Sequence, residues 1–104
     1  MKVGIDLTRI SRFENKKENF INRILTKVEL EEFKKLKDDS KSTFLAVRWA
    51  CKEAIFKATQ DPKYLEYSIL KHSSGEPYVL EHPEMSISIS HEGDYVTSIV
   101  IVEK

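Results

Sequence analysis

One stretch of the sequence, FLAVRWACKEAIFKA (residues 44–58), carries the strongest helical pattern in the chain. At about 100° per residue, small and aromatic residues surround Glu53, and further apolar residues cover much of the opposite side. The residues around Glu53 are Ala46, Trp49, Ala50, Ala54 and Phe56. The pattern predicts a largely buried helix, because a surface helix has only one apolar side.

Lys52, Glu53 and Lys57 place three charges within this helix. Charged side chains are rarely taken fully out of water without partners, so these residues either pair with each other or bind a ligand. Glu53 and Lys57 have the i,i+4 spacing of an intrahelical ion pair, which contributes about 0.2–0.5 kcal/mol. Alternatively, the two side chains form one wall of a site for a metal ion and a phosphate. The helix alone leaves both interpretations open.

Length and composition indicate a single domain spanning residues 1–104 with one modest core. Seventeen basic and seventeen acidic residues cancel, so we expect no nucleic-acid partner. There is neither an apolar run of about 20 residues nor a signal-peptide core, so we expect no membrane span and a cytoplasmic location. The lone Cys51 should behave as a small buried hydrophobe.

The chain before the helix begins with an alternating strand, residues 3–8. We expect Val3, Ile5 and Leu7 on its buried face and the Asp6 carboxylate on the other. Gly4 suggests that another group approaches closely there, although Asp6 is also compatible with a solvated strand end. Short amphipathic helical segments follow, and residues 26–29 have the spacing of a capping box. Residues 38–42 supply N-cap candidates for the central helix, which should stop before Pro62.

After Pro62 the apolar period changes to 2, which predicts strands at residues 64–72, 78–80, 85–90 and 95–102. The last is nearly continuously apolar and should be central in its sheet. The order is therefore a strand, then helices, then a four-strand meander. This order predicts an α+β domain with a mainly antiparallel sheet packed against helices.

Candidate chemistry is limited to a hard-cation site, since no Cys/His cluster has zinc spacing and no P-loop is present. Asp6 and Glu53 offer the carboxylate oxygens that Mg²⁺ accepts. Lys57 could meet a phosphate as a point charge. His91 is either at the mouth of the same cleft or a turn histidine without a function.

Four segments in chain order together resemble the 4′-phosphopantetheinyl transferases, and most closely their short, single-domain group of holo-acyl-carrier-protein synthases. They are Val3-Gly4-Ile5-Asp6, RWACKEAIFK (residues 48–57), Gly75-Glu76-Pro77 and Ser88-Ile89-Ser90-His91. The resemblance runs essentially from end to end of the chain. It implies a homotrimer with active sites at subunit interfaces. The implied reaction transfers the phosphopantetheine of coenzyme A to a serine of apo acyl carrier protein, in support of fatty acid synthesis.

The resemblance also implies roles for individual residues. Asp6, Glu53 and Lys57 would be catalytic, with Asp6 and Glu53 as Mg²⁺ ligands. The base would be Glu53 or a metal-bound water. Coenzyme A would contact a larger set: Arg48, Lys52, Lys57, Gly75, Pro77, Ser90 and His91. The acidic carrier protein would meet a basic segment that contains Arg9, Arg12, Lys16, Lys17 and Arg23 against only two acidic residues.

One stretch departs from the family pattern. Residues 58–63, ATQDPK, stand where the family has a Gly-rich loop near the coenzyme A phosphates, so the sequence does not assign the groups that hold the 3′-phosphate. Two alternatives to an enzyme remain: a non-catalytic module that binds carrier proteins, and a small oligomeric domain with a structural Glu53–Lys57 pair. Two carboxylates, a lysine and a histidine together favour the enzyme, because a binding module has no need of them.

Overall fold

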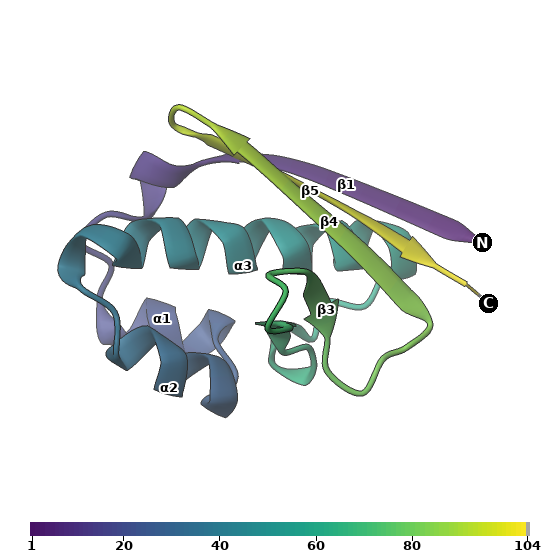
Figure 1. The fold of residues 1–104 in the computed structure, drawn as a ribbon, viewed down its shortest axis with the longest axis horizontal. Helices are drawn as coiled ribbons and strands as arrows, with labels where there is room; N and C mark the ends of the chain where they lie inside the picture. The colour runs from purple at the N-terminus through teal and green to yellow at the C-terminus, as the bar shows by residue number, and fades with distance from the viewer. Residues whose placement is uncertain (104) are drawn as a thin grey trace.

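The computed structural model describes residues 1–103 and places one long helix, α3 (Asp38–Thr59), between a sheet and a layer of smaller elements (Figure 1). The sheet contains β1 (Lys2–Arg9), β4 (Met85–Glu92) and β5 (Tyr95–Val102). On the other side of α3 lie α1 (Glu18–Ile24), α2 (Lys27–Lys34) and the hairpin of β2 (Ile69–Lys71) and β3 (Pro77–Val79). Two short 3-10 helices, η1 (Ile10–Phe13) and η2 (Tyr64–Glu66), complete the fold.

The central helix α3 confirms the prediction of a buried helix, since ten of its 22 residues are buried. It ends at Thr59, before Pro62, as predicted. The predicted N-caps are wrong. Lys37 is the N-cap and makes no side-chain hydrogen bond, whereas Asp38 and Asp39 lie in the first turn, where negative charge is favourable.

The larger sheet has the antiparallel order β1-β5-β4, which confirms that β5 is central. The four-strand meander is wrong, because β2 and β3 form a separate two-stranded sheet and β1 takes the second edge of β5. The predicted strand at 64–72 is correct only at Ile69–Lys71. Its first part, Tyr64–Glu66, forms η2. Directly after η2, the Tyr67 hydroxyl donates to Asp61 at 2.8 Å. The α+β class with antiparallel strands packed on helices is confirmed.

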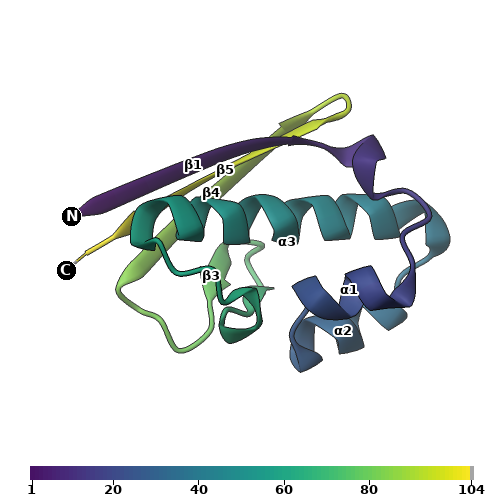
Figure 2. The ribbon, with the colours of Figure 1, turned by 180° about the vertical axis from the view of Figure 1, so that it is seen from behind.

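The orientation predicted for β1 is also wrong. Val3, Ile5 and Leu7 are 53%, 58% and 66% exposed, whereas Gly4 is buried against α3. A Cβ at Gly4 would lie 1.9 Å from the Ala54 carbonyl oxygen, so only glycine allows β1 to lie this close to the helix. Figure 2 shows β1 running along α3. Because side chains alternate along a strand, Asp6 shares the face of Gly4 and also faces the helix.

Beneath α3, the predicted capping box at the start of α2 is confirmed. The Thr26 amide donates to Glu29 Oε1 at 2.9 Å, and the Glu29 amide donates to Thr26 Oγ1 at 3.4 Å.

Cys51 is fully buried in α3, and its burial raises the pKa of the thiol to about 11. Within residues 1–103, no helix combines the length and the apolar character needed to cross a membrane.

Candidate functional site

Asp6 and Lys57 meet where β1 crosses the C-terminal half of α3. Lys57 Nζ donates to Asp6 Oδ1 at 3.1 Å. The second oxygen, Asp6 Oδ2, is buried and has no hydrogen-bond partner among residues 1–103. A buried carboxylate oxygen that lacks a donor is unfavourable unless a ligand satisfies it. The structure therefore points to a ligand at Asp6.

Glu53 lies one helical turn before Lys57 and is half-buried. Burial raises the pKa of the Glu53 carboxyl, and the negative charge of Asp6 raises it further, while Lys57 and Arg12 act in the opposite direction. Two carboxylates close enough to affect each other create a demand for positive charge. In residues 1–103, Lys57 forms its ion pair with Asp6 and not with Glu53. The intrahelical Glu53–Lys57 pair is therefore not observed in this part of the chain.

The donor set at this crossing fits Mg²⁺. The free Oδ2 of Asp6 and the Glu53 carboxylate are oxygen ligands, and Mg²⁺ commonly takes one or two protein carboxylates while phosphates and waters complete its shell. No group of three or more His, Cys, Asp or Glu side chains in residues 1–103 is arranged to hold a metal.

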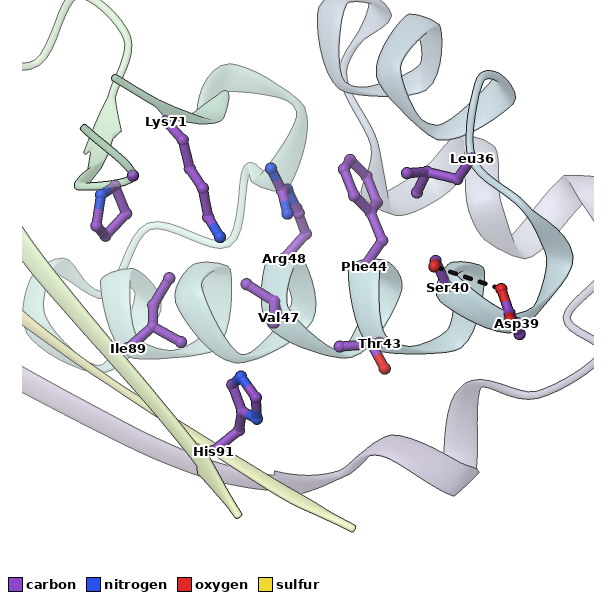
Figure 3. Close-up of a pocket in the computed structure, with 12 residues that line it drawn as sticks. Leu36, Asp39, Ser40, Thr43, Phe44, Val47, Arg48, Lys71, Ile89 and His91 are labelled. Atoms are coloured by element: carbon purple, nitrogen blue, oxygen red, sulfur yellow. Dashed lines mark hydrogen bonds between the residues drawn. The ribbon is translucent and has the colours of Figure 1, made fainter. Parts of the chain in front are cut away.

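A pocket of about 450 Å³ lies on another side of α3, between this helix, the β2–β3 hairpin and β4. Figure 3 shows Arg48 and Lys71 approaching each other across it, with His91 on β4. The guanidinium of Arg48 lies 3.7 Å from the centre of the Phe44 ring, and Arg48 Nη2 donates to the Ile69 carbonyl at 3.0 Å. Burial lowers the pKa of Arg48 from its ordinary value. Three basic side chains around one cavity suit an anionic ligand.

Two of the predicted coenzyme A contacts, Gly75 and Pro77, also line this pocket. Gly75 has φ +95, a conformation that glycine adopts readily, and it lets the hairpin turn beside the cavity. Lys71 was missed from the sequence. It lies in a region predicted only as a strand, and its position at the pocket depends on how the hairpin packs on α3, for which the sequence contains no local signal.

The pocket and the Asp6–Lys57 crossing do not coincide within one chain. Neither Asp6, Glu53 nor Lys57 lines the pocket. Phe44, which lines it, and Glu53 are nine residues apart on α3, and at about 100° per residue this spacing places them on opposite sides of the helix. Within one chain, His91 therefore does not share a cleft with the carboxylates, and a cleft that combines them stays a prediction for an assembly of chains.

A family model described as the 4′-phosphopantetheinyl transferase superfamily matches residues 2–100. The chain belongs to this superfamily. The holo-[acyl-carrier-protein] synthase of Mycoplasma mobile is 46% identical over 99 residues, which are 95% of this chain and 86% of that protein. The resemblance identified from the sequence is thus confirmed.

Solved structures of superfamily members agree with the fold. The holo-(acyl-carrier-protein) synthase of Bacillus anthracis, solved in complex with CoA (3′,5′-ADP), has a TM-score of 0.87 and 30% identity, and 98% of this chain and 95% of that chain are covered. The synthase of Helicobacter pylori, solved in complex with coenzyme A, has a TM-score of 0.78 and 27% identity, with 97% and 99% covered.

Two residues that the 4′-phosphopantetheinyl transferase pattern assigned to coenzyme A lie elsewhere in this chain. Lys52 is fully buried, and its Nζ donates to Glu29 Oε1 and to the Ile24 carbonyl, so the predicted contact with a surface ligand is wrong. Ser90 is exposed, and as the neighbour of His91 in β4 it faces away from the pocket. Within one chain, Ser90 is therefore not part of the pocket.

The basic segment predicted to meet a carrier protein is exposed at all five of its cations. Arg12 Nη1 donates to Thr8 Oγ1 at 3.0 Å, and the Arg12 guanidinium lies 5.8 Å from the centre of the Trp49 ring. Lys16 Nζ lies 4.7 Å from the centre of the Phe20 ring. Since Arg12 also lowers the pKa of Glu53, this basic and aromatic surface of the transferase adjoins the carboxylates.

Proposed function

We propose that this protein transfers the 4′-phosphopantetheine group of coenzyme A to a serine of an apo acyl carrier protein. The products are the holo carrier protein and adenosine 3′,5′-bisphosphate, and the reaction serves fatty acid and lipid synthesis in the cytoplasm. The observation that carries the proposal is the crossing of β1 and α3, which collects Asp6 with its unpartnered buried oxygen, Glu53 and Lys57. The similarity to synthases solved with coenzyme A supports the same substrate.

The residues at this crossing suit phosphoryl transfer, which needs positioning and charge neutralisation more than covalent help from the protein. The serine oxygen forms a bond to the pantetheine-bearing phosphorus, and the pyrophosphate P–O bond breaks, so that the bisphosphate leaves. Mg²⁺ bound by Asp6 and Glu53 would neutralise charge on the pyrophosphate oxygens. When coenzyme A binds, Lys57 would release Asp6 and donate to a phosphate oxygen instead. Glu53 is the candidate base for the serine proton, because its carboxylate lies at this crossing beside Asp6 and can accept a proton there.

The pocket at Arg48, Lys71 and His91 is the proposed site for the adenosine and phosphate end of coenzyme A. Because it lies on the opposite side of α3 from Glu53, the proposal requires two chains, so that the pocket of one subunit adjoins the carboxylates of the next. This arrangement agrees with a homotrimer. It is supported by the apolar outer face of the larger sheet, where Ile5 is the partner of Ile99 in register and both are exposed.

The carrier protein is proposed to dock on the basic segment. Its five cations are exposed on a protein of net charge zero, and two of them, Arg12 and Lys16, lie over the rings of Trp49 and Phe20. An acidic partner would be attracted by the cations and held by the aromatic surface. The position of Arg12 next to Glu53 would bring the carrier serine to the carboxylates.

The substitution Glu53→Gln tests the function because it removes a charge and keeps the volume. We expect transfer to a carrier protein to fall by at least about 1000-fold, since the cation site and the base are both lost. Removing Mg²⁺ with a chelator should abolish transfer by the unaltered protein, and added Mg²⁺ should restore it. Glu31→Gln, at an exposed site on α2, is the matched control and should leave turnover unchanged. Normal turnover by folded Glu53→Gln protein would exclude the role assigned to Glu53.

A further inference from the structure

The ion pair between Glu29 on α2 and Lys52 on α3 is fully buried and has no part in the chemistry described above. Lys52 Nζ donates to Glu29 Oε1 and to the carbonyl of Ile24, at the end of α1. Glu29 Oε1 also accepts from the Thr26 amide at 2.9 Å. Removing two charges from water is costly, and a protein core often replaces such a pair by apolar residues without loss of stability. Stability alone therefore does not account for this ion pair.

The second oxygen of Glu29 reaches the β2–β3 hairpin. The Ile69 amide, at the first residue of β2, donates to Glu29 Oε2 at 2.8 Å. The carbonyl of the same residue accepts from Arg48 Nη2 at 3.0 Å. Ile69 is thus held at both its backbone polar groups by charged side chains from two helices. A third link joins Thr26 Oγ1 and Ser68 Oγ at 2.7 Å.

These links matter because the hairpin is small. β2 and β3 pair over only three residues each, and a two-stranded sheet of this size is barely stable alone. Two residues beyond Ile69 lies Lys71, and across the turn lie Gly75 and Pro77, all of which line the pocket. The place of this pocket wall relative to α3 therefore depends on what holds Ile69.

We infer that Glu29, supported by Lys52, is a positioning residue for coenzyme A: it holds the Ile69 backbone and so fixes the β2–β3 wall of the pocket. This inference rests on the proposed function. Lys52 donates to Glu29 and holds its carboxylate in place, which explains why a lysine occurs at a position with no exposed surface. The pair therefore acts through Ile69 and Arg48 and does not touch the ligand.

The substitution Glu29→Gln tests this role, because glutamine has the same shape but only one acceptor oxygen. Lys52 and the Thr26 amide are both donors at one end of the side chain, so the amide oxygen of Gln must face them. Its NH₂ group then faces the Ile69 amide, and the bond to Ile69 is lost. We expect the Ile69 amide to exchange hydrogen at least about tenfold faster, beyond any change at Val100 in β5.

Calorimetry should show that Glu29→Gln binds coenzyme A about tenfold more weakly, the equivalent of one hydrogen bond to a charged group. The turnover number and the KM for the carrier protein should stay within about twofold, because the carboxylates and the basic segment do not move. Val102→Ala, a core change at the far end of β5, is the control for a general loss of stability and should bind coenzyme A normally. If Glu29→Gln does not fold, Ser68→Ala removes only the link to Thr26 and should weaken coenzyme A binding about twofold to threefold.

Three results would overturn the inference. The first is tight coenzyme A binding by both Glu29→Gln and Ser68→Ala. The second is an equal loss of affinity in Val102→Ala, which would indicate a general effect of stability. The third is an unaltered protein that binds no coenzyme A, and only this result would also overturn the proposed function.

Discussion

Gly4 is the residue that makes the candidate site possible. Its missing side chain lets β1 lie against α3, where a Cβ would be 1.9 Å from the Ala54 carbonyl oxygen and 2.8 Å from the Ala58 amide nitrogen. Both neighbours are helix backbone, which cannot rotate away as a side chain can. The close approach then brings Asp6, two residues along the strand, to Lys57.

The substitution Gly4→Ala should therefore reduce both stability and activity. We expect the free energy of unfolding to fall by about 2–3 kcal/mol, because the added methyl group forces β1 away from α3. Denaturant titration measures this loss. Glu31→Gln, at an exposed site on α2, is the control and should change stability by less than about 0.5 kcal/mol. A Gly4→Ala protein as stable as the control would show that β1 and α3 do not lie this close.

The sequence predicted the positions of some site residues better than those of others. Asp6, Glu53 and Lys57 were recognised as a group because their chemistry is of one kind, and the structure brings them together. Lys52 carries the same charge as Lys57 but pairs inside the core with Glu29. The sequence contains the capping box that places Glu29 at the start of α2, but nothing in it shows that α2 packs over Lys52.

At the scale of elements, α3 ends without a glycine at its C-terminus. The helix ends with Gln60 in the left-handed conformation, φ 65, a position that usually favours glycine. The Gln60 amide donates to the Phe56 carbonyl at 2.6 Å and closes the last turn. Within residues 58–63, the helix therefore ends at a strained residue, Gln60, where the family pattern has a Gly-rich loop.

Gln60→Gly should for this reason stabilise the protein. We expect a gain of about 0.5–1 kcal/mol in the free energy of unfolding, since glycine adopts the left-handed region without a steric cost. Thermal or denaturant unfolding measures the change. Replacing Lys63, which lies just beyond the cap, by Gly is the comparison and should destabilise or have no effect. A loss of stability in Gln60→Gly would contradict the assigned backbone conformation.

Long and strongly periodic elements were predictable, and short ones were not. The central helix, the β4–β5 hairpin and the capping box followed from local pattern. The strand at 64–72 was overestimated because its first residues form η2, where Tyr64 packs edge-on against Trp49 of α3. The buried face of β1 was misassigned because its apolar residues face outward, toward a surface that a single chain does not cover.

At the scale of the whole molecule, the larger sheet has an outer face with several exposed apolar side chains. Val3, Ile5, Leu7, Tyr95 and Ile99 are all exposed on it. A contiguous apolar surface on a small domain usually marks an interface. The same interface would unite the pocket of one chain with the carboxylates of another.

Ile99→Lys tests this assembly. Ile99 lies on β5 between Ile5 and Ser88 and is 37% exposed in the isolated chain. A charge at the centre of the proposed interface should convert the homotrimer to monomers, because burying an unpaired ammonium is unfavourable. Sedimentation velocity measures the mass, and transfer activity should be lost with the trimer. Glu31→Lys on α2 should leave the trimer intact, and a trimeric Ile99→Lys protein would exclude this face as the interface.

The proposed transferase activity is tested by the intact mass of a carrier protein after reaction. The purified protein is incubated with coenzyme A, Mg²⁺ and a set of apo acyl carrier proteins, together with a carrier whose acceptor serine is replaced by alanine. We expect that at least one carrier gains the mass of one phosphopantetheine group, and that the alanine carrier gains none. No mass gain by any carrier, with folded protein and Mg²⁺ present, would contradict it.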